Sequence, residues 1–319
     1  MQPDHAEMID WARRVLRQPE ATAEAIVDTP WSSVVALHTP ISTHYLKRTA
    51  PDLFIESSVI NTCRNLCGVT AIPEIIAQNE ALHCFLMASC GDMSLRALFQ
   101  GGMNIPPFIE AMGMYRAFQR ATVQHVSAFL ALGVPDWRLA QFPALYDGLV
   151  RDDLFLKAQG LDADQARDLR QAAPALSALC LELAGYAIPE SLNHSDLNDN
   201  NILITTATQK ISIIDLGETA VDHPFLSLAA TLARTTGRYV IRPHTPEYQQ
   251  LQTACFAGFL DSEAATQRAI ALTKKLLPVY ALLAHVRLAA ASGPALGTVP
   301  RMEGRLRGFF TEFLLFLND

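Results

Sequence analysis

The chain has 319 residues, half of them hydrophobic, so it is long enough for two sub-domains or one large one with a substantial buried core. Its formal charge at pH 7 is −7, and no cluster of Lys and Arg stands out along it. Because the sequence offers no basic patch to neutralise phosphates, we do not expect it to bind nucleic acid.

The start of the chain and its cysteines bear on location. The first residues lack the basic-then-apolar pattern of a signal peptide, and no uncharged apolar run approaches roughly 18 residues. We therefore expect a cytoplasmic protein with no membrane-spanning helix and no membrane partner. Of the six cysteines, Cys63 and Cys67 lie four apart but have no further ligands at metal-binding spacing. Buried free thiols are the better interpretation.

The N-terminal part of the chain alternates helix and strand signals. Apolar residues at helical spacing predict an amphipathic helix over residues 5–17. After a break at Pro30, residues 34–37 and 43–47 form two β-prone runs on either side of a turn at Pro40. These two strands are expected to begin a small antiparallel sheet.

The middle and end of the chain have a helical pattern. Three amphipathic runs cover residues 108–132, 144–158 and 162–187, and Asp162 is placed to cap the third run. A later apolar stretch over residues 276–291 predicts a buried core helix.

A polar segment over residues 194–201 is followed by two short apolar runs. These runs cover residues 202–204 and 211–214, and the second ends in Asp215. Two β-branched segments joined by polar residues predict a hairpin. A hairpin places the ends of its strands side by side, so polar residues that flank it are expected to lie close together.

Three of these flanking side chains form a chemical set: Asp196, Asn201 and Asp215. A carboxylate that receives a proton, with an amide and a carboxylate that hold a hard cation, is typical of Mg-assisted phosphoryl transfer. The spacing His194-x-Asp196-x-x-x-x-Asn201 also fits the catalytic loop of kinases, with Asp215 where their metal-holding Asp is expected. A polar turn rich in Asn and Asp, with one capping His, is the structural alternative.

On these residues the chain resembles the aminoglycoside phosphotransferase family of the protein-kinase-like superfamily. The family's usual run is HGDLHPGN, and this chain has Asn198 in place of the second His and Asn200 in place of the Gly. Asn visits left-handed backbone more readily than other non-Gly residues, so the second change is tolerable. Relatives usually carry an Asp where Ser227 stands, placed to brace the loop and cap the next helix; Ser also caps helices.

The resemblance covers roughly residues 30–230 and is strongest over 191–217. It implies an α+β, two-lobed protein-kinase-like fold with a small antiparallel-sheet N-lobe and a larger, mainly helical C-lobe. The N-lobe, expected over residues 1–88, would bind the nucleotide. The C-lobe, expected over 89–319, would carry catalysis and the acceptor site.

The resemblance also implies a phosphate grip in the N-lobe. Lys47 would contact the nucleotide phosphates, and Glu56 on the following helix would hold its side chain in place. Taken alone, the pattern favours a surface Lys on an edge strand and a Glu on a solvated helix face. No glycine precedes Gly68, so a glycine-rich phosphate loop is absent, and Ser32 and Ser33 stand about where its distal half would fall. Their amides and hydroxyls would contact phosphates instead, or cap the following strand.

The hinge between the lobes is expected just after a strand over residues 81–87. There the backbone groups of Met87, Ser89 and Cys90 are the candidates to contact the nucleotide base. Farther along, Glu218 and Asp222 lie beside the expected metal site in the sequence. A second metal contact or a contact to a substrate ammonium is open to them, but solvated loop carboxylates are commoner and are what we expect.

The implied activity is transfer of the γ-phosphoryl group of ATP or GTP to a hydroxyl of a small molecule, with Mg²⁺ as cofactor. Asp196 would orient the hydroxyl and accept its proton, while Asn201 and Asp215 would hold the ion. A metabolite kinase acting on an amino alcohol, amino acid or sugar would use the same chemistry. The alternative class is a non-catalytic kinase-like protein that binds a nucleotide or a partner, which the missing glycine loop favours.

Overall fold

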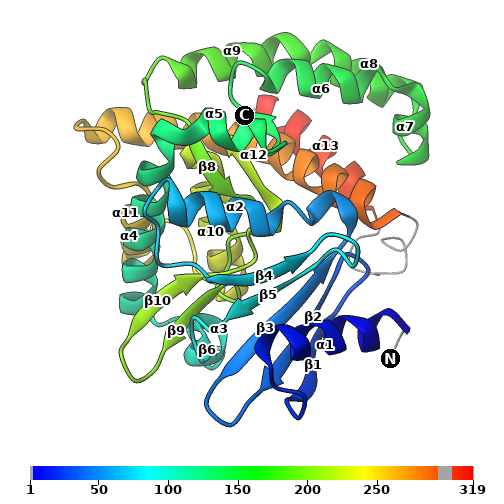
Figure 1. The fold of residues 1–319 in the computed structure, drawn as a ribbon. Coiled ribbons are helices and arrows are strands. Elements are labelled where there is room, and N and C mark those ends of the chain that lie inside the picture. The colour runs from blue at the N-terminus through cyan, green and yellow to red at the C-terminus, as the bar shows by residue number, and fades with distance from the viewer. Residues whose placement is uncertain (1–2, 294–303, 319) are drawn as a thin grey trace. The chain divides into compact units, whose positions relative to one another are not determined.

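The computed structural model describes residues 3–293 and 304–318 (Figure 1). Backbone contacts divide the chain into two compact units. The first consists of Met1–Gln100, Asp199–Glu218 and Leu288–Leu296, and the second of Gly101–Asn198, Thr219–Arg287 and Gly297–Asp319. The first unit thus extends beyond residue 88. It also includes the predicted hairpin, which in the sequence lies between the two long segments of the second unit. A functional boundary between residues 88 and 89 stays a prediction.

The first unit contains a five-stranded antiparallel sheet in the order β1-β2-β3-β5-β4 (Figure 1). The strands are β1 (Thr22–Asp28), β2 (Ser32–His38), β3 (Thr43–Thr49), β4 (Ile75–Asn79) and β5 (Cys84–Ala88). The predicted antiparallel sheet at the N-terminal end is confirmed. Strand β1 was not predicted, because all seven of its residues are exposed and it shows no alternation of buried and exposed positions.

Two helices accompany this sheet. Helix α1 (Pro3–Leu16), predicted from its periodicity, packs Met8 and Ala12 against Val35 and Leu46 of the sheet, all of them buried. Helix α2 (Glu56–Asn65) follows the short 3₁₀ turn η1 (Pro51–Leu53). Burial of the apolar face of α1 against the sheet therefore builds the core of this part of the chain.

The predicted hairpin forms and belongs to a second sheet of the first unit, in the order β10-β9-β6. Strand β9 (Ile202–Thr205) pairs antiparallel with β10 (Lys210–Ile213) and with β6 (Met93–Ser94), and β6 leads into α3 (Leu95–Phe99). A 3₁₀ turn, η3 (Leu216–Glu218), follows the hairpin closely. Just before β6, Gly91 lies so close to β9 that an added Cβ would stand 2.6 Å from the Cβ of Leu203.

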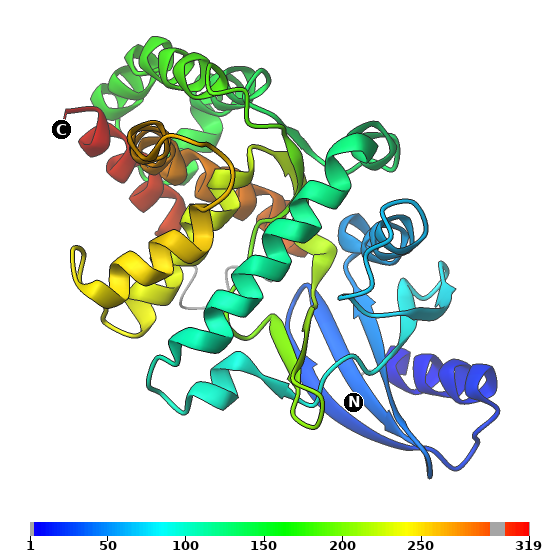
Figure 2. The ribbon, with the colours of Figure 1, turned by 90° about the vertical axis from the view of Figure 1, so that its left-hand side faces the viewer.

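The second unit is mainly helical and contains a small sheet in the order β7-β11-β8. Its strands are β7 (Asp136–Trp137), β8 (Ser191–His194) and β11 (Thr219–Asp222). Its helices up to residue 184 are α4 (Ile105–Thr122), α5 (Val126–Ala131), α6 (Phe142–Arg151), α7 (Asp153–Ala158), α8 (Ala163–Gln171) and α9 (Ala173–Ala184). Those that follow are α10 (Pro224–Arg238), α11 (Pro246–Phe256), α12 (Glu263–Ser292, within this unit up to Arg287) and α13 (Arg305–Asn318). Figure 2 shows the long α4 with α11 packed beside it.

The three helical runs predicted in the middle of the chain are present, but each is divided. The first becomes α4 and α5 with the 3₁₀ turn η2 (Val123–His125) between them, the second α6 and α7, and the third α8 and α9. Asp162 caps α8 as predicted: its side chain accepts from the amide of Gln165, whose own side chain accepts from the amide of Asp162.

Helix α12 is one described helix whose length and apolar composition would allow it to cross a membrane. No such helix was expected from the sequence, because Lys274, Lys275 and Arg287 interrupt the apolar run. Within the fold, 61% of its most apolar window is buried. It therefore has the burial of a core helix, which is what residues 276–291 predicted.

The close approach of Gly91 to β9 yields a test. We expect Gly91→Ala to lower the free energy of unfolding by about 1–3 kcal/mol, because the new methyl group meets the backbone and Cβ of β9. The matched control is Gly148→Ala in α6, where no atom lies within 4 Å of the added Cβ and where Ala favours the helix. Chemical denaturation measures both variants, and equal effects would contradict the account.

Candidate active site

Lys47 is the centre of the candidate site in the first unit. Its Nζ lies 2.6 Å from Oε2 of Glu56 and 2.5 Å from Oδ1 of Asp215. Strand β3 supplies the lysine, the first residue of α2 supplies Glu56, and the segment after β10 supplies Asp215. The expected partner of the lysine, Glu56, and the residue predicted to hold the metal ion, Asp215, thus both contact Lys47.

Burial makes this contact strong. The side chains of Lys47 and Glu56 are 6% and 2% exposed, whereas that of Asp215 is 43% exposed. Burial by itself would lower the pKa of Lys47, but the two carboxylates outweigh it and raise the pKa above its ordinary value. The lysine therefore keeps its positive charge and presents it at a fixed position.

The backbone after β10 is also attached to α2. The amide of Leu216 donates to Oε1 of Glu56 at 3.1 Å. A Cβ on Gly217 would stand 3.1 Å from Oε2 of the same carboxylate, so a small residue suits this position. Asp215 itself has φ +66°, the left-handed region that Asp and Asn visit more readily than most residues. Glu56 thus holds both the lysine and the segment that carries Asp215.

Asn201 and Asp215 flank the open end of the hairpin. The amide of Ile214 donates to the carbonyl of Asn201 at 3.0 Å, which places these two ends of the hairpin side by side. Among residues 3–293 and 304–318, no three or more His, Cys, Asp or Glu side chains are grouped to hold a metal ion. One amide and one accessible carboxylate are a donor set that fits Mg²⁺, which is typically bound through one or two protein oxygens and substrate phosphates.

The segment just before Asn201 is fixed by an ion pair within the first unit. The guanidinium of Arg96 in α3 donates to Oδ1 of Asp199 from Nη2 at 2.7 Å and from Nε at 3.0 Å. The backbone amide of Arg96 also donates to the carbonyl of Asp199 at 2.9 Å. Because the Asp199 side chain is only 4% exposed, this contact holds the approach to Asn201 firmly.

The serines predicted to replace a glycine loop lie at the start of β2. Ser32 closes the turn from β1, since its carbonyl accepts from both the amide and the hydroxyl of Thr29. Ser33 is 6% exposed, and its hydroxyl has no hydrogen-bond partner in the described part of the chain. A phosphate contact of either serine stays a prediction.

The predicted hinge residues follow one another at the end of β5. Met87 is in the strand, and the hydroxyl of Ser89 donates to the carbonyl of Gly91 at 3.2 Å. Cys90 is partly buried beside Ser212, and burial raises the pKa of its thiol to about 11, so the thiol stays neutral. All six cysteines are free, as expected. The nucleotide contacts of the hinge stay predictions.

Asp196 belongs to the second unit, in the loop after β8. Its amide donates to Nδ1 of His194 at 3.2 Å, and Nδ2 of Asn198 donates to its Oδ2 at 3.2 Å. Nη2 of Arg234 in α10 lies 3.6 Å from its Oδ1. His194 therefore supports the loop through its imidazole. The predicted convergence of Asp196 with Asn201 and Asp215 stays a prediction.

Two residues beside this loop were not predicted. Arg234 also donates to the carbonyl of Ser195 at 2.9 Å, and Tyr115 in α4 accepts from the amide of His194 at 2.8 Å. The periodicity of residues 108–132 indicated only an apolar face for the helix of Tyr115, and no helix was predicted around Arg234. Nothing local in the sequence marks them, because each reaches the loop through tertiary packing.

One acidic residue near the motif is placed differently from the prediction. Asp222, expected to be a solvated loop carboxylate, ends β11 and is fully buried, because this strand is paired on both sides. Burial raises its pKa well above the ordinary value. Burial also lowers the pKa of neighbouring His223 to about 3. Glu218, in η3, is half-buried.

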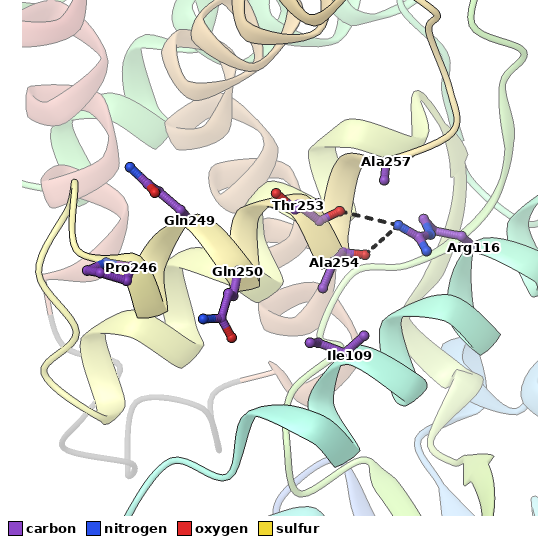
Figure 3. Close-up of a pocket in the computed structure, with 8 residues that line it drawn as sticks. All are labelled: Ile109, Arg116, Pro246, Gln249, Gln250, Thr253, Ala254 and Ala257. Carbon is purple, nitrogen blue, oxygen red and sulfur yellow. Dashed lines mark hydrogen bonds between the residues drawn. The ribbon is translucent and has the colours of Figure 1, made fainter.

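A surface cavity of about 450 Å³ lies between α4 and α11 in the second unit (Figure 3). Arg116 extends across it and donates from Nη1 to the carbonyls of Thr253 and Ala254, at 3.4 and 2.7 Å. These carbonyls belong to the last turn of α11, where a cation is favoured by the helix dipole. Arg116 therefore serves to cap α11, and none of the predicted site residues lines the cavity.

The buried ion pair predicts a stability effect. Lys47→Met leaves Glu56 buried without its cation, so we expect the free energy of unfolding to fall by roughly 3–5 kcal/mol. Adding Glu56→Gln should restore part of the loss, because no uncompensated buried charge then remains and the side chain of Asp215 is 43% exposed. The exposed Lys157→Met is the matched control and should change stability by less than about 0.5 kcal/mol. Urea denaturation measures the free energy of unfolding of each variant. An equal loss in Lys47→Met and Lys157→Met would contradict the idea that the burial of Lys47 and Glu56 makes their ion pair important for stability.

Asp222 predicts a pH effect of definite sign. Its folded pKa lies above the unfolded value, so the stability that its protonated form contributes is present at low pH and is lost as pH rises. The gain in unfolding free energy from Asp222→Asn should therefore grow between about pH 4 and pH 7. Asp164→Asn, at a position with a side chain 79% exposed, should show no such trend in the same denaturation series. If the gain in unfolding free energy from Asp222→Asn did not change with pH, burial would not be raising the pKa of this carboxyl.

No family model matches the sequence, and no curated protein matches it. The fold, in contrast, is similar to solved structures over almost the whole chain. An ethanolamine kinase of Plasmodium vivax matches with a TM-score of 0.66 and 12% identity, over 95% of this chain and 86% of that one. A choline kinase from Streptococcus pneumoniae matches with a TM-score of 0.63 and 12% identity, over 98% and 99%.

A third similar structure is the GDP complex of aminoglycoside 2'-phosphotransferase-IIIa, with a TM-score of 0.59 and 15% identity, over 98% of this chain and 97% of that one. At these identities the likeness concerns the fold. The predicted fold class is confirmed, with an antiparallel sheet at the N-terminal end and a mainly helical C-terminal part. The chain has the protein-kinase-like fold found in small-molecule kinases and aminoglycoside phosphotransferases.

Proposed function

We propose that the protein is a Mg-dependent phosphotransferase that moves the γ-phosphoryl group of ATP or GTP to a hydroxyl of a small molecule. The observation that carries the proposal is the contact of Lys47 with both Glu56 and Asp215. A purely structural role gives little reason to hold a buried cation between a buried carboxylate and one that is 43% exposed. A charged group that must meet phosphates while remaining fixed accounts for both features.

In this proposal each residue has a separate task. Lys47 binds the phosphates that are not transferred, and Glu56 keeps it in position. Asn201 and Asp215 would hold Mg²⁺, which when bound offsets negative charge on the phosphate oxygens. Asp196 orients the acceptor hydroxyl and takes its proton as the new bond to phosphorus forms.

The nucleotide and the acceptor are proposed more broadly. The similar structures include a GDP complex and an ADP-bound one, which supports a purine nucleotide without deciding between ATP and GTP. Amino alcohols and aminoglycosides lead the list of acceptors to test, because the similar proteins are named for such substrates. Fold alone does not assign a substrate, so sugars and amino acids stay in the list. A cytoplasmic location and the absence of nucleic-acid and membrane partners stay predictions.

The second candidate is a kinase-like protein that binds a nucleotide or partner without catalysis. The turn between β1 and β2 favours it, since Thr29 and Ser32 close that turn and no glycine stands in it. The preserved set of Asp196, Asn201 and Asp215 favours the enzyme, because a binding protein needs no proton acceptor.

Two substitutions test the assignments. A coupled assay measures transfer from ATP and from GTP to aminoglycosides, amino alcohols, amino acids and sugars. We expect Asp196→Asn to lower kcat at least about 100-fold without weakening nucleotide binding, because the proton acceptor is lost. Asp215→Asn should weaken binding of the Mg-nucleotide itself, measured by calorimetry with and without Mg²⁺.

Asp164→Asn, on the exposed face of α8, is the control and should match the wild type in both measurements. Full transfer by both site variants would refute the assignments. Nucleotide binding without transfer to any acceptor would favour the binding protein.

A further inference from the structure

The strand that leads to Asp196 ends at His194, and both backbone groups of this residue are bonded to side chains. Within the second unit, the amide of His194 donates to the hydroxyl of Tyr115 at 2.8 Å. The hydroxyl of Ser227 donates to the carbonyl of His194 at 2.8 Å. The two hydroxyl oxygens lie 2.7 Å apart. Side chains of helices α4 and α10 thus both bind the backbone of His194, which lies two residues before the proposed proton acceptor, Asp196.

The direction of each bond follows from counting protons. Ser227 has one hydroxyl proton, and it goes to the carbonyl of His194. The bond between the two hydroxyls must therefore use the proton of Tyr115, so Tyr115 donates to Ser227 and accepts from His194. The result is a closed ring of three hydrogen bonds that all run in one direction, an arrangement in which each bond polarises the next.

Burial makes the ring hard to replace. Tyr115 and Ser227 are fully buried and His194 is 1% exposed, so water is not at hand to take over a lost bond. Burial also raises the pKa of Tyr115 above its ordinary value, so the phenol keeps the proton that the ring requires. Both hydroxyls have a donor and an acceptor role in this ring, which a Phe or an Ala could not perform.

The ring of hydrogen bonds is connected to the proposed reaction through His194. The imidazole Nδ1 of His194 accepts from the amide of Asp196 at 3.2 Å, so the orientation of the imidazole affects the position of the Asp196 backbone. A second contact, from Nδ2 of Asn198 to the carbonyl of Asp196 at 2.8 Å, holds the other side of that residue. A shift of His194 would therefore be passed to Asp196.

We propose that Tyr115 is a positioning residue: together with Ser227 it clamps the backbone of His194 and thereby sets the position of Asp196. This inference rests on the proposed function for its kinetic consequence. Its structural part concerns only the second unit and stands by itself. The role lies with the hydroxyl of Tyr115 and not with the bulk of its ring, because the apolar packing of a Phe would be the same.

The chain offers a matched control. Tyr146 is also fully buried, and its hydroxyl also has a backbone partner, the carbonyl of Leu169 at 2.8 Å. Tyr146→Phe therefore removes the same atom from an equally buried setting in the same unit, with no bond to the catalytic loop. Any general cost of losing a buried hydroxyl appears in both variants.

The experiment compares Tyr115→Phe with Tyr146→Phe in the full-length protein. Amide hydrogen exchange of His194 and the amide resonance of Asp196, both followed by NMR, report the structural part. We expect exchange at His194 at least about 10-fold faster and a displaced Asp196 resonance in Tyr115→Phe only. Where transfer is measurable, kcat should fall about 10- to 100-fold with KM within about twofold, because Asp196 is misplaced.

Ser227→Ala is the second variant. In a double-mutant cycle, its effect on the free energy of unfolding should not be additive with that of Tyr115→Phe, whereas the effects of Ser227→Ala and Tyr146→Phe should be additive. If exchange at His194 and the Asp196 resonance stay unchanged in Tyr115→Phe, the inference is wrong. It is also wrong if they change while kcat does not. If the wild type transfers phosphoryl to no acceptor, the proposed function fails, and the NMR comparison alone still decides whether Tyr115 positions Asp196.

Discussion

The structure of the first unit depends on one buried cation. Lys47 reaches from the sheet to Glu56 and to Asp215, and Glu56 in turn accepts from the backbone beyond Asp215. A lysine that is 6% exposed stays charged only because two carboxylates face it. The same contact therefore joins β3, α2 and the end of the hairpin, and gives the proposed phosphate-binding group one position.

The two carboxylates that matter most for the proposed chemistry have different surroundings. Asp215 is tied to a cation and to backbone in a left-handed conformation, which suits a group that must hold an ion at one place. Asp196 is contacted by Asn198 and Arg234 and is attached through His194 to a buried ring of hydroxyls. Rigid support from buried polar contacts, with the carboxylates themselves partly exposed, is what reacting groups require.

The similarity in fold without a match in sequence has a physical explanation. Many apolar sequences can fill a core of this shape, so two proteins with the same fold need not have the same residues at their buried positions. Under the proposed function, only a few positions near the hairpin and in the loop after β8 must keep their chemistry. Of the residues in which this chain differs from the usual motif, Asn198 and Asn200 adjoin Asn201 in the sequence, and Ser227 shares its contacts with Tyr115.

From the sequence alone we could predict the helix over residues 5–17 and the hairpin after Asn201, and propose the residues of the site, because periodicity and motif spacing are local signals. It did not reveal β1, whose exposed residues carry no alternation, or the burial of Asp222. The sequence also showed no sign that Asp215 contacts Lys47 beside Glu56, or that Tyr115 supports His194; the folded structure shows both contacts. These contacts join residues far apart in the chain, and no local pattern records which distant side chain will fill a buried hydrogen-bonding position.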